Sequence, residues 1–144
     1  LPLGLKDHPR NKSDAELKFI ADHGGFIGVT MFSPFLKRGN DSTVHDYVEA
    51  IDYVINIVGE DCVGLGSDFT QGHGHEFFDM LTHDKGRWRR LTTFGQVINP
   101  EGIRTIGDFP NLTATMQQTG WSDARITKVL GANWMKFFDQ VWGT

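Results

Sequence analysis

The sequence has 144 residues, of which 39% are hydrophobic and 22% charged, so it predicts one folded domain rather than a disordered chain. Its net charge of -4 gives no electrostatic reason to expect nucleic acid, and the short basic cluster at 87–90 is best explained as a solvated loop. The single cysteine, Cys62, excludes an internal disulfide and a multi-cysteine metal site. No stretch approaches the roughly 18 apolar residues that a membrane span requires.

A helix followed by a strand is predicted near the amino terminus. Ser13 and Glu16 have the spacing of a capping box, in which the two side chains satisfy free backbone N–H groups at a helix start. Apolar residues recur at helical spacing over 17–21, and the glycine pair 24–25 is typical of a helix end. The apolar run 26–31 then indicates a short buried strand.

A second helix and strand follow directly. Apolar residues at helical spacing predict a helix from about Ser42 to Gly59. The run 62–66 predicts another buried strand, and Ser67 and Asp68 follow it. Alternating helices and strands with short links are typical of an α/β fold with a parallel sheet.

The remainder is an irregular segment followed by helices. Periodicity fails over 69–110, which we interpret as a long loop excursion on the active-site side of the fold. Helices are predicted over 112–118 and from Ser122, the latter with a strongly apolar face. Because both predicted strands are apolar throughout, we expect further sheet beyond these two strands.

Asp68 and Arg10 are the main candidates for function. A carboxylate directly after a buried strand lies where α/β enzymes gather catalytic groups, although Asp is also common in turns and helix caps. The guanidinium of Arg10 has the geometry to clamp a carboxylate with two hydrogen bonds, although a plain surface arginine is the commoner case.

His73 and His75 form the one pattern that suggests a metal ligand pair. Residues at i and i+2 project to one side of a strand, but Gly72 and Gly74 favour an irregular loop instead. No third ligand has a defined spacing, so these histidines are weak metal candidates. The sequence also lacks a phosphate loop, a nucleophile elbow and a His-Glu-x-x-His helix.

Three segments resemble the renal (membrane) dipeptidase family, and the match extends over nearly all of residues 1–144. They are His8-Pro9-Arg10-Asn11 before a helix, Val63-Gly64-Leu65-Gly66-Ser67-Asp68-Phe69 after a strand, and Gly131-Ala132-Asn133-Trp134 before the last helix. The loop Gly72-His73-Gly74-His75 resembles a bacterial branch of this family.

The resemblance implies the C-terminal part of a (β/α)8 TIM-like barrel of the metal-dependent amidohydrolase type. Family members hydrolyse dipeptides with two zinc ions at the C-terminal mouth of the barrel. Arg10 matches the arginine that holds the substrate's terminal carboxylate, and Asp68 matches the aspartate at the last strand. Phe32 and Phe35 fall where relatives line the substrate pocket.

One departure from the family pattern concerns the metal. The resemblance places the zinc ligands upstream of the motif that contains Arg10, and the chain begins at Leu1 without methionine. We therefore expect the isolated chain to be inactive and to need the missing N-terminal half of the barrel as its partner. A homodimer is also possible. The sequence does not decide the cellular compartment, for which we favour the bacterial cytoplasm or periplasm.

Two other functions are kept as alternatives. The first is another barrel enzyme of the amidohydrolase type, such as a deaminase or lactonase. The second is a non-enzymatic interaction domain that uses its aromatic C-terminal helices as a contact surface. An arginine placed for a terminal carboxylate favours dipeptides over both alternatives.

Overall fold

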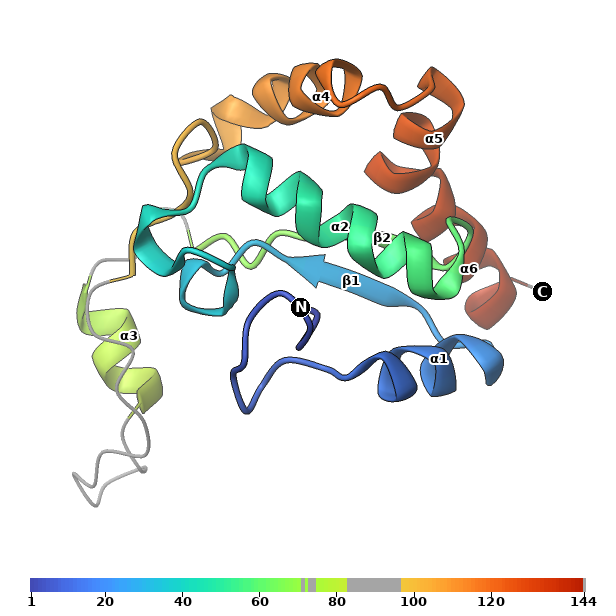
Figure 1. The fold of residues 1–144 in the computed structure, drawn as a ribbon, viewed down its shortest axis with the longest axis horizontal. Helices are drawn as coiled ribbons and strands as arrows, with labels where there is room; N and C mark the ends of the chain where they lie inside the picture. Colours follow the sequence, from blue (N-terminus) through green and yellow to red (C-terminus); the bar gives the residue numbers. More distant parts are fainter. Residues whose placement is uncertain (71, 73–74, 83–96, 144) are drawn as a thin grey trace.

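A two-stranded parallel sheet with helices packed around it forms the centre of the molecule (Figure 1). The computed structural model describes residues 1–70, 72, 75–82 and 97–143, with only the backbone described at 75, 78 and 79. Strands β1 (Ile27–Thr30) and β2 (Val63–Gly66) pair in parallel, with Ile27 opposite Val63 and Thr30 opposite Gly66. No helix of these residues is long and apolar enough to cross a membrane.

The first helix has the two ends that its sequence predicts. Helix α1 (Asp14–Asp22) begins with a capping box between Ser13 and Glu16. At its other end the N–H groups of Gly24 and Gly25 donate to carbonyls of the last turn, with Gly24 at a φ of 74°. This is the hydrogen-bond pattern of a Schellman motif, which turns the chain sharply from α1 into β1.

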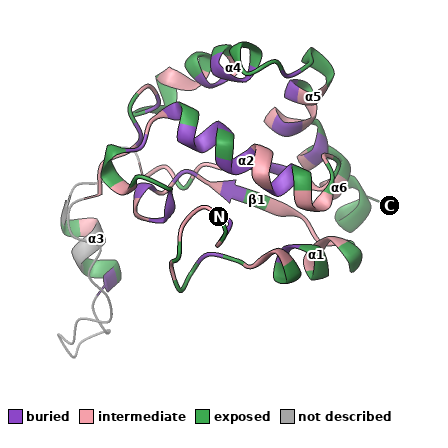
Figure 2. Ribbon diagram, in the orientation of Figure 1, coloured by how far each residue is buried: buried purple, intermediate pink, exposed green. Residues whose placement is uncertain are grey.

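The core lies between the sheet and helix α2 (Val44–Val58), which runs along one face of both strands (Figure 2). The hydroxyl of the buried Tyr47 donates to the carbonyl of Val29 at 2.7 Å and so joins α2 to β1. Deeply buried apolar residues come from both strands, α2, the later helices and the connecting segments: Val29, Met31, Val48, Ile51, Val54, Val63, Ile103, Leu112, Met116 and Val129.

Two side chains occupy the outer edge of β2. Ile27 N–H donates to Cys62 C=O, so the carbonyls of Val63 and Leu65 point away from β1. Asn133 donates to the Val63 carbonyl at 2.9 Å, and the Trp134 indole N–H donates to the Leu65 carbonyl at 2.9 Å. These side chains therefore take the hydrogen-bonding positions that a neighbouring strand would occupy.

Trp134 also packs on the sheet, and a glycine makes room for it. A Cβ atom built at Gly64 would lie 2.8 Å from Trp134 Nε1 and 2.9 Å from the ring of Phe26. The rings of Phe26 and Trp134 have centroids 4.1 Å apart. Gly64 therefore allows the indole ring to lie against the backbone of β2.

The C-terminal third is helical, as its sequence predicts. Helices α4 (Phe109–Gln118), α5 (Asp123–Thr127) and α6 (Asn133–Trp142) follow one another, with a π-helical segment (Lys128–Ala132) joining the last two. Short 3-10 turns occur at Ser33–Phe35, Gly39–Asp41 and Ile106–Asp108. Ser122 caps α5 by accepting from Arg125 N–H at 3.2 Å.

The structure differs from the sequence prediction in the segment 69–110. Helix α3 (His75–Thr82) lies inside this segment, and α4 begins at Phe109 rather than Leu112. Phe77, Met80 and Leu81 have the spacing of one helix face, a short pattern that the surrounding glycines and histidines conceal. The α/β class is confirmed, whereas the two strands described here are too few to close a barrel.

Candidate functional site

The carboxyl ends of β1 and β2 lie at the same end of the sheet, because the strands are parallel (Figure 1). The chain continues from β1 into Phe32 and from β2 into Asp68, while Arg10 belongs to the segment before α1. We refer to Arg10, Phe32, Phe35 and Asp68 as the carboxyl-end cluster. It contains the four residues that the sequence nominated for catalysis and substrate binding.

Asp68 has an unusual backbone and an unusual carboxyl group. Its φ of 57° makes it the one non-glycine residue with positive φ among those the structure describes. Such conformations are strained for most side chains and concentrate at functional sites. Desolvation raises the pKa of its carboxyl above the ordinary value, although the residue as a whole is exposed, and the positive charge of Arg10 opposes this rise.

Arg10 is exposed and rests on an aromatic ring. Its guanidinium carbon lies 5.5 Å from the ring centroid of Phe35, which is a cation–π contact. The positive charge of Arg10 also acts on Asp68, whose pKa it lowers. Phe35 follows β1 and Asp68 follows β2, so Arg10, on the ring of Phe35, and Asp68 both belong to the carboxyl ends of the strands.

The two phenylalanines contact each other but differ in exposure. The ring centroids of Phe32 and Phe35 are 4.8 Å apart, in an edge-on arrangement. Phe35 is only 9% exposed, so its ring supports Arg10 from beneath, whereas Phe32 is half-buried and retains some accessible surface. Of the two, Phe32 is therefore the better placed to touch a ligand.

Two neighbours of Arg10 belong to this arrangement, and neither was among the residues predicted for catalysis or substrate binding. The ring of His8 lies 4.5 Å from that of Phe35, and its Nδ1 accepts from the Arg10 backbone N–H at 3.2 Å. Asn11 is buried and donates to the carbonyls of Lys6 and Phe35 at 3.0 Å each. The sequence signal that could have identified His8 and Asn11 is their position on either side of Arg10.

The described residues do not form a metal centre by themselves. No group of three or more His, Cys, Asp or Glu side chains in that part of the chain could hold a metal ion. His73 lies outside the described residues, as does the side chain of His75, whose backbone begins α3. The described residues therefore do not fit the ligand set of a zinc site.

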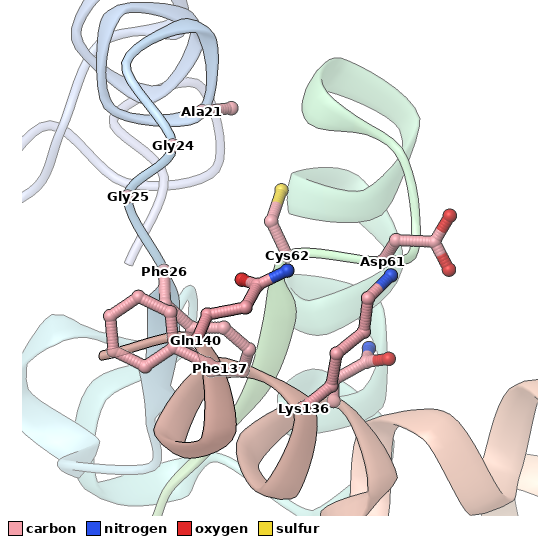
Figure 3. A pocket seen from close by; sticks show the side chains of 10 residues that line it. Ala21, Gly24, Gly25, Phe26, Asp61, Cys62, Lys136, Phe137 and Gln140 are labelled. Atoms are coloured by element: carbon pink, nitrogen blue, oxygen red, sulfur yellow. The ribbon is translucent and has the colours of Figure 1, made fainter. Parts of the chain in front are cut away.

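A separate cavity of about 170 Å³ lies at the opposite, amino ends of the strands (Figure 3). Its wall includes residues that precede β1 and β2 and one face of α6: Ala21, Gly24, Gly25, Phe26, Asp61, Cys62, Asn133, Lys136, Phe137 and Gln140. Burial raises the pKa of the Cys62 thiol, which opposes formation of a reactive thiolate. None of the carboxyl-end cluster lines this cavity.

Comparison with known proteins places the chain in a peptidase family. The model of the membrane dipeptidase family, peptidase family M19, matches residues 1–93. The chain therefore belongs to the membrane dipeptidase family.

Individual relatives agree with this assignment. An uncharacterized protein encoded in the pqqA 5' region of Klebsiella pneumoniae is 32% identical over 142 residues, which are 96% of this chain and 43% of that protein. The dipeptidase ataJ of Aspergillus terreus is 28% identical over 139 residues, which are 95% of this chain and 28% of that protein. The chain thus spans less than half the length of these relatives.

Solved structures show the same arrangement of helices and strands. An amidohydrolase from Pseudomonas aeruginosa is 66% identical, with a TM-score of 0.96 over 100% of this chain and 44% of that one. A metallopeptidase from Rhodobacter sphaeroides, liganded with a phosphinate mimic of the dipeptide L-Ala-D-Ala, is 23% identical, with a TM-score of 0.73 over 97% of this chain and 34% of that one. The second likeness concerns the fold alone.

Proposed function

We propose that this chain is the C-terminal part of a zinc-dependent dipeptidase with a (β/α)8 barrel, and that it supplies residues for substrate binding and catalysis. Family membership supports the dipeptidase activity, as do relatives that are named dipeptidases. The observation that carries the proposal is the position of Arg10 on the ring of Phe35 after β1, with Asp68 directly after the parallel strand β2.

Arg10 is proposed to bind the free C-terminal carboxylate of a dipeptide. A guanidinium presents parallel N–H donors that match the two oxygens of a carboxylate. The ring of Phe35 lies beneath the guanidinium and restricts its motion, so less conformational entropy is lost on binding. Phe32 would contact the substrate beside this carboxylate.

Asp68 is proposed to accept a hydrogen bond from the substrate or to assist proton transfer near the scissile bond. Its raised pKa brings the carboxyl closer to the range in which a group both accepts and releases a proton near neutral pH. The nearby charge of Arg10 keeps the ionised form accessible. Arg10 can therefore bind the substrate carboxylate while Asp68 acts near the scissile bond, both at the carboxyl ends of the strands.

Zinc, when bound in such an enzyme, would supply Lewis-acid polarisation of the substrate carbonyl and activation of water at neutral pH. The family resemblance has these ligands upstream of the motif that contains Arg10, so we propose that they lie in polypeptide outside this chain. The residues of this chain would then bind and orient the dipeptide, while activity would require the complementary part of the barrel.

Comparison of the full-length polypeptide with the isolated 144 residues tests the proposal. The full-length protein is expected to hydrolyse dipeptides with a C-terminal D-residue, to lose this activity to a chelator and to regain it with zinc. The isolated chain is expected to be inactive. Chelator-sensitive dipeptidase activity from the isolated chain would contradict the placement of the ligands, and a full-length protein without dipeptidase activity would contradict the function.

The same preparations test the expected partner. Phe19, Met135, Val141 and Trp142 are among the large apolar side chains that are exposed in the described chain. We expect the isolated chain to self-associate or to bind the N-terminal half, because exposed apolar surface of this kind favours association. A monodisperse monomer with a cooperative thermal transition, measured by light scattering and calorimetry, would contradict this expectation.

A further inference from the structure

We propose that Asn11 is the positioning residue of Arg10: its buried amide ties the segment carrying Arg10 to the turn after β1, so that the guanidinium points at the substrate carboxylate. The inference rests on the proposed function, since it concerns how the carboxylate-binding arginine is held. Neither the family match nor the relatives assign a role to Asn11.

Asn11 bridges two segments through one nitrogen atom. The side chain is 5% exposed, and Nδ2 donates to the carbonyls of Lys6 and Phe35 at 3.0 Å each. Both partners are carbonyl oxygens, which only accept, so the network fixes which end of the amide is the NH₂ group. The bond to Phe35 joins residues that are 24 positions apart in the chain.

The second segment held by this bridge is the one that supports the guanidinium. The carbonyl of Phe35 accepts from Asn11, while the ring of Phe35 lies 5.5 Å from the guanidinium carbon of Arg10. The same ring contacts His8 at 4.5 Å between centroids. Loss of the Asn11 bridge would therefore let the arginine segment and its aromatic support separate.

Asn11 also retains an unfavourable feature. Its Oδ1 atom is buried and accepts no hydrogen bond from the residues that the structure describes. A buried acceptor without a partner is destabilising, so an apolar residue of similar shape would relieve this penalty if the bridge had no other value. We infer that the value of the amide lies in its two donated hydrogen bonds, which fix the segment beside Arg10 to the turn after β1.

The chain contains a matched control at the other end of the sheet. Asn133 is 4% exposed, and its Nδ2 also bridges two carbonyls, those of Glu60 at 2.6 Å and Val63 at 2.9 Å. It lines the cavity at the amino ends of the strands, away from Arg10. Substitution of Asn133 therefore removes the same chemistry without touching the arginine segment.

The test compares Asn11→Ala and Asn133→Ala in the full-length zinc-loaded protein. Steady-state kinetics are measured with a dipeptide and with the same dipeptide carrying a C-terminal amide, and melting temperatures are recorded. For Asn11→Ala we expect KM for the free acid to rise about tenfold with kcat nearly unchanged, because uniform substrate binding is weakened. The preference for free acid over amide should fall by a similar factor.

Asn133→Ala should lower the melting temperature comparably while KM and the acid-over-amide preference change less than about twofold. If both variants change KM equally, or if Asn11→Ala keeps the full preference, Asn11 does not position Arg10. If Asn11→Ala does not fold, Asn11→Ser retains one hydroxyl donor and should show a smaller loss of the same preference.

Arg10→Met separates this inference from the proposed function. If Arg10→Met abolishes the acid-over-amide preference and Asn11→Ala does not reduce it, only the positioning role is wrong. If Arg10→Met leaves the preference intact, the role proposed for Arg10 is wrong and the role of Asn11 is overturned with it.

Discussion

The two ends of the short sheet are built from the same parts and differ in what those parts hold. At the amino ends, Asn133 bonds to the Val63 carbonyl, while Trp134 packs on the sheet and bonds to Leu65 further along β2. At the carboxyl ends, Asn11 joins the segment of the exposed Arg10 to the Phe35 carbonyl, and Asp68, with its positive φ, follows β2. We propose that the first arrangement serves stability and the second substrate binding.

The carboxylates at the two ends show the same contrast. The ammonium of Lys128 donates to Asp61 at 2.7 Å and lowers the pKa of that carboxyl, so it favours the ionised form. Desolvation raises the pKa of Asp68 instead, and Arg10 offsets only part of that rise. The pKa of a carboxyl group paired with an ammonium is thus lowered, whereas that of a partly desolvated carboxyl group is raised.

The largest expected effect on stability comes from the indole that packs on the sheet. Trp134→Ala removes a half-buried indole and its hydrogen bond to Leu65, and should lower the free energy of unfolding by about 2–3 kcal/mol. Substrate KM should stay within about twofold of the parent value, because the carboxyl-end cluster is untouched. Chemical denaturation of the full-length protein measures the first value, and an equal loss of substrate affinity would break the contrast between the ends.

The largest expected effect on substrate binding comes from Arg10. Arg10→Met should reduce kcat/KM for free-acid dipeptides by roughly 30-fold, about 2 kcal/mol, through loss of a charge-assisted contact. Since Arg10 is exposed, the free energy of unfolding should change by less than about 0.5 kcal/mol. Lys18→Met, which removes an exposed cation on α1, serves as the control and should leave both quantities unchanged.

A smaller effect is expected from the strained aspartate. Asn tolerates positive φ better than Ala does, so Asp68→Ala should be less stable than Asp68→Asn by about 1 kcal/mol. Equal stabilities in denaturation experiments would show that the backbone at this position is not strained. Both variants should lose activity if Asp68 is catalytic.

The smallest effect is a dependence on pH. Because the pKa of Asp68 is raised in the folded state, ionisation of its carboxyl disfavours folding above that pKa, and this penalty disappears below the unfolded value. Wild-type stability should therefore gain slightly from this group as the pH falls from neutral, and Asp68→Asn should lack this contribution. Denaturation midpoints measured across acidic to neutral pH check the sign, and a contribution that increases with pH would contradict it.

The sequence predicted the elements whose signals are local. The capping box at Ser13 and Glu16 and the glycine pair after α1 bounded that helix correctly, and apolar runs located both strands to within about two residues. Helix α3 was missed because its apolar stripe spans only eight residues. Local patterns of cap, stripe and turn were therefore sufficient for most of the framework.

The location of the candidate site could be predicted from the sequence, but the hydrogen bonds that hold its residues could not. Parallel strands place their carboxyl ends together, so Asp68 could be located next to the turn after β1 from topology alone. The bridge from Asn11 to Phe35 and that from Asn133 to Val63 join residues 24 and 70 positions apart. A side chain that bonds a distant carbonyl leaves no periodic trace in the sequence, so neither bridge was foreseen.

The two outer edges of the sheet differ in whether side chains bond to their backbone groups. A strand added beside β2 would have to displace Asn133 and Trp134 from the carbonyls they occupy. The outward backbone groups of Gly28 in β1 bear no such side-chain bond among the described residues. In the proposed barrel, β1 can therefore take a neighbouring strand directly, whereas pairing at β2 requires Asn133 and Trp134 to release these carbonyls.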